Sequence, residues 1–318
     1  MSQDIRDAFF EQMHLLARED ASVVFLTADM GAFALEAFRR ELPGRYINVG
    51  VAEQNMISVA AGLALSGKKV FVHSIIPFVT ARCYEQISVD LSVMKLPVVV
   101  VGMGAGLTYA GDGPTHHAVH DIALMRSLPD FTVFSPCDAL STRAACRMAH
   151  SAKGPVYVRL EKGILPQVYN DQDDMALGMK QVRRGQDVLI AATSNMTHQA
   201  VLVADVLKAK GIAAGVVDVL RLKPFNENLW HPMCRGVRLI VTLEEHSLVG
   251  GLGSIISECH GLRPSCPVMM MGVKDRHSVE PLSRELLQEQ HGLSVGAIVA
   301  GIEQALDQGV DNGSGIKR

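Results

Sequence analysis

The sequence is poor in aromatic side chains, in cysteine pairs and in net charge. Aromatic residues make up 5% of the 318 residues, and the formal net charge is -3. A chain so nearly neutral offers no basic face to nucleic acid or to an acidic membrane, so we expect small molecules or other subunits as partners. The six cysteines form no C-x-x-C pair, and the chain begins without a charged segment followed by an apolar one. We therefore expect a protein of the reducing cytoplasm.

A long apolar run is also missing. The most continuous apolar stretch, Leu96 to Leu107, is interrupted by glycines and is far shorter than the ~20 residues that span a bilayer. It is typical of a buried strand and the loop after it. Glycine and alanine are plentiful, which suits helices that pack closely on a parallel sheet covered on both faces.

Strand patterns and helical patterns alternate along the whole chain. In the first half we predict strands at residues 22–27, 46–49, 69–73, 97–101, 132–134 and 156–159, with helices between them. After a polar, acidic stretch the second half has strand patterns at 187–192, 212–219 and 237–243 and a helical one at 198–210. This alternation predicts an α/β fold of two doubly wound domains. We place the first domain at residues 1–168, a linker at 169–184 and a smaller α/β domain at 185–318.

Glu53 is the first residue with a candidate chemical role. It stands in Val51-Ala52-Glu53-Gln54-Asn55, where a short apolar strand turns into an alanine-rich helix. Its neighbours are apolar, so burial of this carboxylate without a partner would be costly. Taken alone, a glutamate favoured by the dipole at a helix N-terminus is the simpler explanation.

A glycine-rich loop, Gly111-Asp112-Gly113-Pro114-Thr115-His116-His117, carries an acid and two imidazoles. With His120 it suggests a zinc cluster, and its first residues suggest the metal-diphosphate motif of thiamine enzymes. We reject both. Zinc would want a further ligand, and the diphosphate motif needs an asparagine about thirty residues further on, where residues 130–140 contain none. We expect no metal ligand from this chain.

The order of these motifs carries a family resemblance. Glu53 in Val-Ala-Glu-Gln-Asn, Phe78 ahead of Arg82-Cys83-Tyr84-Glu85-Gln86, and the loop 111–117 follow one another as in the pyrimidine-binding domain of transketolases. The chain resembles the C-terminal half of a transketolase, and its second domain is similar to the family's C-terminal domain. The resemblance implies a thiamine diphosphate enzyme that transfers a two-carbon ketol unit between a ketose and an aldose.

The resemblance implies roles in cofactor binding for three residues. Glu53 would hydrogen-bond to N1′ of the aminopyrimidine and stabilise the imino form whose nitrogen takes the thiazolium proton. Phe78 would stack on the pyrimidine ring, although it is also typical of a core residue. Asp29 matches an acid beside the cofactor, and a turn-forming aspartate explains it equally well.

Four further residues are implied to contact the substrate. Asp112, His116 and His117 would meet the hydroxyl groups of the donor ketose near its reacting carbons, and His116 would also take part in catalysis. Arg159 stands where family members hold an arginine for the sugar phosphate, which suits a planar guanidinium. An arginine that closes a strand end is an equal alternative. Glu244, Glu245 and His246 carry no chemistry that we can assign.

The resemblance also implies a partner subunit. A full transketolase has an N-terminal half that grips the diphosphate and magnesium, and this chain contains nothing similar. We therefore predict a separate subunit that supplies the diphosphate-binding domain and most of the Mg²⁺ shell. The active site would lie at the interface of an α2β2 assembly, a heterotetramer.

Departures from the family pattern concern the donor sugar. Gly104 stands where transketolases usually have a histidine, Phe33 stands near a serine position of some transketolases, and residues 101–107 lack the arginine usual in deoxyxylulose-phosphate synthases. We therefore favour a specialised enzyme for a phosphorylated, branched or sulfonated sugar. The alternatives are a 2-oxo-acid dehydrogenase β subunit, a deoxyxylulose-phosphate synthase-like enzyme and a non-catalytic assembly subunit. Asp112 and His116 argue against the first, because sugar-hydroxyl contacts are of no use to a short oxo acid.

Overall fold

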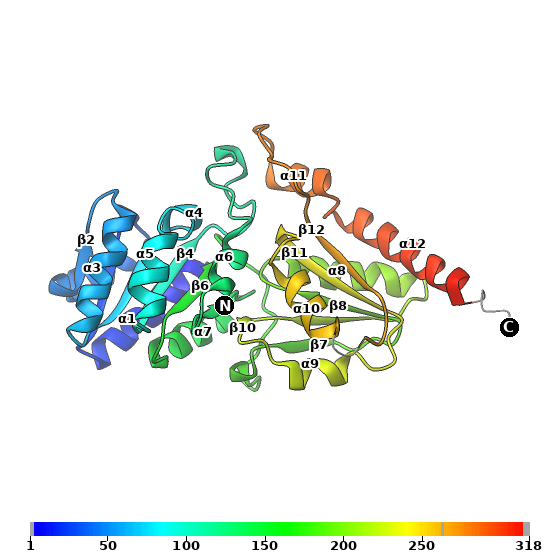
Figure 1. The fold of residues 1–318 in the computed structure, drawn as a ribbon, viewed down its shortest axis with the longest axis horizontal. Helices are drawn as coiled ribbons and strands as arrows, with labels where there is room; N and C mark the ends of the chain where they lie inside the picture. The colour runs from blue at the N-terminus through cyan, green and yellow to red at the C-terminus, as the bar shows by residue number, and fades with distance from the viewer. Residues whose placement is uncertain (1–2, 262–263, 314–318) are drawn as a thin grey trace.

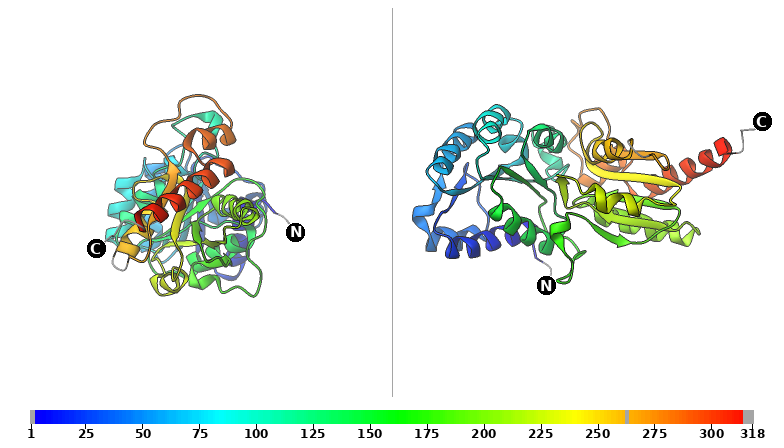
Figure 2. Two further views of the ribbon diagram at one scale, coloured as in Figure 1. Left: turned by 90° about the vertical axis from the view of Figure 1, so that its right-hand side faces the viewer. Right: turned by 60° about the horizontal axis from the view of Figure 1, so that its bottom comes forward.

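The chain forms two sheets that lie side by side along the molecule (Figures 1 and 2). The structure, a computed structural model, describes residues 3–261 and 264–313, the last six of these as backbone only. One sheet has seven strands and the other has five, and almost all neighbouring strands are parallel. The predicted α/β fold with two helix-covered, mostly parallel sheets is confirmed.

The first sheet has the strand order β10-β5-β6-β4-β3-β1-β2. Its strands are β1 (Val23–Thr27), β2 (Tyr46–Asn48), β3 (Lys69–Ile75), β4 (Val98–Met103), β5 (Thr132–Phe134), β6 (Val156–Leu160) and β10 (Arg221–Lys223). Strands β1, β4 and β6 are buried along their whole length, as is β3 up to its last residue. Helices cover both faces of these strands, which is why their sequences are continuously apolar instead of alternating.

Two sets of helices cover the two faces of this sheet. One face packs against α1 (Ile5–Glu19), α2 (Leu35–Glu41) and α7 (Ala139–Ser151). The other packs against α3 (Glu53–Leu65), the π-helical turn η2 (Ile87–Val93) and α6 (Asp121–Ser127). The short helices α4 (Ile76–Val79) and α5 (Tyr84–Gln86) connect β3 to η2.

The second sheet has the order β12-β11-β8-β9-β7. Its strands are β7 (Lys180–Arg183), β8 (Val188–Ala192), β9 (Ala214–Asp218), β11 (Leu239–Ser247) and β12 (Val268–Val273). Helices α8 (Met196–Ala209) and α12 (Val295–Gly313) cover one face, and α9 (Glu227–Met233) and α10 (Leu252–Gly261) cover the other. Helix α11 (Arg284–His291) lies between β12 and α12 in the chain.

Two strands depart from the predicted organisation. The predicted linker ends in β7, which pairs antiparallel with β9 as an edge strand. Its Lys-Gln-Val-Arg sequence is half-buried and polar, so it gives no apolar period. Strand β10 belongs to the second half of the chain but pairs with β5 of the first sheet. The two sheets are therefore joined by an exchanged strand, and the division at 169–184 stays a prediction.

The cysteines and the helices bear on where the protein works. All six cysteines are unpaired thiols, and five of them are buried. Among the described residues, no helix combines the length and the apolar character that a membrane crossing requires. Location in the cytoplasm stays a prediction.

Candidate active site

The candidate residues gather where the strands of the first sheet end. Asp29 follows β1, Glu53 begins the helix after β2, Phe78 lies in α4 directly after β3, and the loop 111–117 lies between β4 and α6. Ligands of open α/β sheets bind at this carboxyl edge, where the chain leaves the strands. In Figure 1 the segment between β4 and α6 rises from this edge beside α11.

Glu53 is a buried carboxylate at the first position of α3. Its side chain is 3% exposed. Ser74 at the end of β3 donates from Oγ to Oε1 over 3.2 Å, and Arg82 donates from Nη1 to Oε2 over 2.9 Å. The helix N-terminus, one hydroxyl and one guanidinium therefore offset the cost of burying this charge.

Phe78 joins Glu53 to the loop. The Arg82 guanidinium that contacts Glu53 lies 4.2 Å from the centre of the Phe78 ring. On its other side the Phe78 ring meets His116 edge to face, with ring centres 5.0 Å apart. Three residues predicted from the sequence are thus brought together, because the chain segments that follow β2, β3 and β4 meet at one edge. Arg82 joins them, and the sequence pattern around Phe78 contained it without indicating a role.

The two imidazoles of the loop have different surroundings. His116 is half-buried and lies against Phe78 and, at 6.1 Å, against the ring of Tyr109. His117 is 7% exposed, its Nε2 lies 3.3 Å from the carbonyl oxygen of Ala110, and burial lowers its pKa. His117 also lines a cavity of about 340 Å³ whose other wall includes Lys274 and Arg276. His117 therefore stabilises the loop from within, while His116 faces the ring of Phe78.

Asp112 and Asp29 lie at the margins of this group. Asp112 is exposed at the tip of the loop, in the 3₁₀ turn η3 (Ala110–Asp112), and the following Gly113 has a φ of 77° that favours glycine. Asp29 is exposed, has a φ of 57°, and exchanges hydrogen bonds with Asn48 at the end of β2. The local geometry of Asp29 is that of a turn residue that connects two strand ends.

Arg159 is placed differently from the prediction. Its side chain is 1% exposed, its Nε donates to Asp121 over 2.9 Å, and its Nη2 donates to the carbonyl oxygens of Ala118 and Glu245 over 3.1 Å each. A buried guanidinium held by these groups does not reach a sugar phosphate, which contradicts the predicted contact. Arg159 instead joins β6 to the start of α6 and to β11 of the second sheet.

A buried ionic network beneath the loop was missed from the sequence. Arg284 of α11 lies between the fully buried carboxylates of Glu161 and Glu245, at 3.1 and 2.5 Å. Burial alone would raise the pKa of Glu161, but the Arg284 guanidinium outweighs it and holds that pKa below its usual value. Glu245 also accepts the backbone N–H of Leu107 over 2.9 Å. The second sheet thus fixes the base of the loop, and the strand-end Glu245 in the sequence was the one signal of it.

The described residues give no support to a metal in the loop. Among histidine, cysteine, aspartate and glutamate side chains in the described part of the chain, three or more come close enough to share an ion at Glu227, His231 and Cys259 only. This group lies in α9 and α10, away from the loop. The zinc cluster that the loop histidines suggested was rejected from the sequence, and their different surroundings agree with that rejection.

Comparison with known proteins identifies similar domains and similar chains. The family model for the transketolase pyrimidine-binding domain matches residues 1–167, and the model for the transketolase C-terminal domain matches residues 178–298. The chain is 36% identical to the 6-deoxy-6-sulfo-D-fructose transketolase subunit SqwH of Clostridium sp. (strain MSTE9), over 96% of this chain and 95% of that one. It is 37% identical to an apulose-4-phosphate transketolase subunit of Phocaeicola vulgatus, over 88% and 91%.

A solved structure agrees with these sequence matches. The chain is similar to a split gene transketolase described as an inactive beta4 tetramer, with a TM-score of 0.87 and 36% identity. The similarity covers 96% of this chain and 98% of that one. All three relatives are therefore matched over nearly their full length.

Proposed function

This chain belongs to the transketolase family, and we propose that it is the C-terminal-half subunit of a split thiamine diphosphate-dependent transketolase that is active only with a partner subunit. The reaction is the transfer of a two-carbon ketol unit from a ketose to an aldose. One observation carries the proposal: the buried carboxylate of Glu53 lies beside a half-exposed aromatic ring and a half-buried imidazole at the carboxyl edge of a parallel sheet. An acid, a stacking surface and a hydrogen-bonding side chain are the groups that an aminopyrimidine and a sugar need.

The residues fit the cofactor at the pyrimidine end. Glu53 would accept a hydrogen bond from, or share a proton with, N1′ of the aminopyrimidine, and Phe78 would lie against the ring face. Asp29, at the neighbouring strand end, would face the cofactor from β1. When bound, thiamine diphosphate supplies a carbanion that accepts the two-carbon unit. The residues of this chain would orient the pyrimidine, hold a proton at Glu53 and exclude water.

The substrate would lie above Phe78, under the loop. Asp112 is free to accept hydrogen bonds from sugar hydroxyls, and His116 is placed to donate to an oxygen near the reacting carbons. His117 would act by stabilising the loop from within, and Arg159 by holding the start of α6. We retain the proposal that the donor is a phosphorylated, branched or sulfonated ketose, and the relatives named for a sulfosugar and for apulose 4-phosphate support it.

The partner subunit would bind the diphosphate and Mg²⁺. The relatives named as transketolase subunits, and the split gene transketolase whose beta4 tetramer is inactive, support a requirement for such a partner. We propose an α2β2 heterotetramer in the cytoplasm, with the cofactor between an N-terminal-half subunit and this chain.

Calorimetry with thiamine diphosphate and Mg²⁺ tests this proposal. It is done on this chain alone and then together with the N-terminal-half protein encoded beside it. We expect binding in the mixture and none with the chain alone, followed by ketol transfer from one donor in a screen of phosphorylated and sulfonated ketoses. Tight binding by the chain alone would refute the requirement for a partner, and no binding in the mixture would refute the cofactor assignment.

A further inference from the structure

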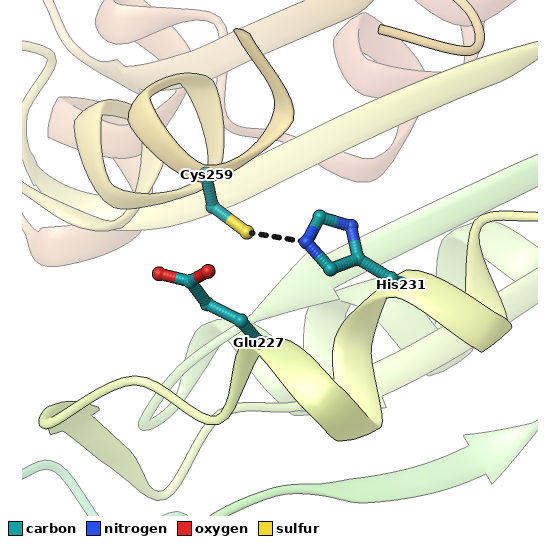
Figure 3. Close-up of side chains that lie close together, drawn as sticks. All are labelled: Glu227, His231 and Cys259. Atoms are coloured by element: carbon teal, nitrogen blue, oxygen red, sulfur yellow. Dashed lines mark hydrogen bonds between the residues drawn. The ribbon is translucent and has the colours of Figure 1, made fainter. Parts of the chain in front are cut away.

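Three side chains with affinity for zinc converge on the outer side of the second sheet. Glu227 and His231 lie four residues apart on α9, so they share one face of that helix. Cys259 comes from α10 and points to the same place (Figure 3). Their ligand atoms all lie within 4.8 Å of one another, and Cys259 Sγ lies 3.7 Å from His231 Nε2.

These distances are close to those of a tetrahedral zinc site. With Zn–S of about 2.3 Å, Zn–N of about 2.0 Å and Zn–O of about 2.1 Å, neighbouring ligand atoms of a tetrahedron lie about 3.4–3.6 Å apart. The sulfur–nitrogen separation already matches this range. Glu227 is the ligand that has to move, and its side chain is exposed and therefore free to change rotamer.

The two helices hold the ligands firmly. Helix α9 is anchored by Trp230, which is fully buried, and its first turn is capped by Asn226, whose side chain accepts the N–H of Leu229 over 3.1 Å. Cys259 is 5% exposed on α10, which packs against β11. Since the thiol and the imidazole are already positioned, zinc would bind without unfolding or refolding either helix.

We propose that Glu227, His231 and Cys259 bind one Zn²⁺ ion, with the fourth position taken by water. The donor set of one thiolate, one imidazole and one carboxylate suits zinc better than magnesium or calcium, which prefer oxygen ligands alone. The ion would connect α9 to α10. Because α9 follows β10, which pairs with β5 of the first sheet, the ion would also stabilise the exchanged strand that joins the two sheets. This inference does not depend on the proposed ketol transfer.

Metal titration of the full chain, free of tags and pretreated with a chelator, tests the site. Zn²⁺ is titrated by calorimetry, and Co²⁺ is titrated in the spectrophotometer as a coloured substitute. We expect one site per chain, a near-ultraviolet thiolate-to-cobalt absorption band, and a rise in melting temperature with zinc. Cys259→Ser should abolish the band, and His231→Gln should weaken zinc binding at least about tenfold.

Two controls make the result specific. Glu36→Gln changes a glutamate in the first turn of another seven-residue helix and should bind zinc like the wild type, whereas Glu227→Gln should bind more weakly. Both glutamates are exposed, so neither substitution should unfold the chain. The double variant His116→Gln, His120→Gln should leave zinc binding intact. Absence of saturable zinc binding, or binding that is lost with the loop histidines and kept in His231→Gln and Cys259→Ser, would overturn the proposal.

Discussion

Arg82 Nη1 donates to Glu53 Oε2 over 2.9 Å, and the same guanidinium lies 4.2 Å from the centre of the Phe78 ring. Arg82 therefore contacts both groups that the proposed function assigns to the aminopyrimidine of the cofactor. The pyrimidine and the guanidinium cannot occupy the same side of Phe78 together. Arg82 is 44% exposed, so its side chain can turn toward solvent when the cofactor enters.

Replacing Arg82 should consequently strengthen cofactor binding. Arg82→Gln removes a competing partner of Glu53, and a pair this exposed contributes about 0.2–1 kcal/mol, so the dissociation constant of thiamine diphosphate should fall about 1.5- to 5-fold. Calorimetry on the reconstituted complex measures it. Arg39→Gln, which changes an exposed arginine near Glu36 on α2, is the matched control and should have no effect. Weaker binding in Arg82→Gln would mean that Arg82 itself contacts the bound cofactor or substrate.

Glu53→Gln should remove most of the activity and leave the fold intact. Glutamine keeps the size of the side chain and an oxygen for Ser74, but it cannot share a proton with N1′. A loss of roughly 10²- to 10⁴-fold in kcat is expected for a missing proton-transfer partner. Steady-state kinetics of the reconstituted complex measure it, with circular dichroism as the check on folding.

The exposed Glu85 provides the comparison for this substitution. Glu85→Gln lies on α5, close in the chain to Arg82, and should leave kcat unchanged. If Glu53→Gln is as active as Glu85→Gln, the chain is an assembly subunit and does not catalyse ketol transfer.

Arg284→Met should destabilise the chain strongly. It leaves the buried carboxylates of Glu161 and Glu245 without their cation, and breaking a buried pair in this way costs roughly 3–5 kcal/mol. Arg183→Met removes an exposed pair with Asp205 and should cost less than about 1 kcal/mol. Urea unfolding followed by circular dichroism compares the two, and equal losses would show that the network contributes nothing special.

The same network should respond to acid. Because Arg284 holds the pKa of Glu161 below its usual value of 4.5, the ion pair stabilises the folded state above that pH. This stabilisation is lost as the pH falls below 4.5 through the lowered pKa of the folded state. The difference in stability between wild type and Arg284→Met should therefore shrink under those acidic conditions.

The sequence was sufficient for the fold class and for the location of Glu53, Phe78 and His116. Each of these residues follows a strand with a continuous apolar pattern, and the carboxyl ends of parallel strands meet at one edge. Strand β10 could not be predicted, since three residues carry no periodicity and their partner β5 lies almost ninety residues earlier in the chain. Its pairing depends on how the two sheets pack.

Arg159 shows why a strand-end residue is hard to interpret from sequence. Its direction depends on Asp121 and on the carbonyl oxygen of Glu245, which come from α6 and from the second sheet. Neither contact has a local sequence signal. The same holds for Arg284, whose two carboxylates come from β11 and from the segment after β6.

His73 should make the stability of the chain depend on pH in the mildly acidic range. It is fully buried in β3 among Phe10 and Phe25, its Nδ1 donates to the carbonyl oxygen of Val101 over 3.1 Å, and its Nε2 has no partner among the described residues. Burial lowers its pKa from 6.5 to about 4. As the pH falls below 6.5 the unfolded chain takes up the proton first, so the folded state loses stability, by up to about 3 kcal/mol near pH 4.

His73→Phe tests this relationship, because phenylalanine fits the aromatic surroundings and does not titrate. Urea unfolding midpoints at pH 7 and pH 5 should differ less in His73→Phe than in the wild type. Some pH dependence should remain, since burial also lowers the pKa of His246 to about 4. His277→Gln changes an exposed histidine and should keep the wild-type pH dependence. If His73→Phe keeps it as well, the proton uptake that destabilises the fold occurs at other groups.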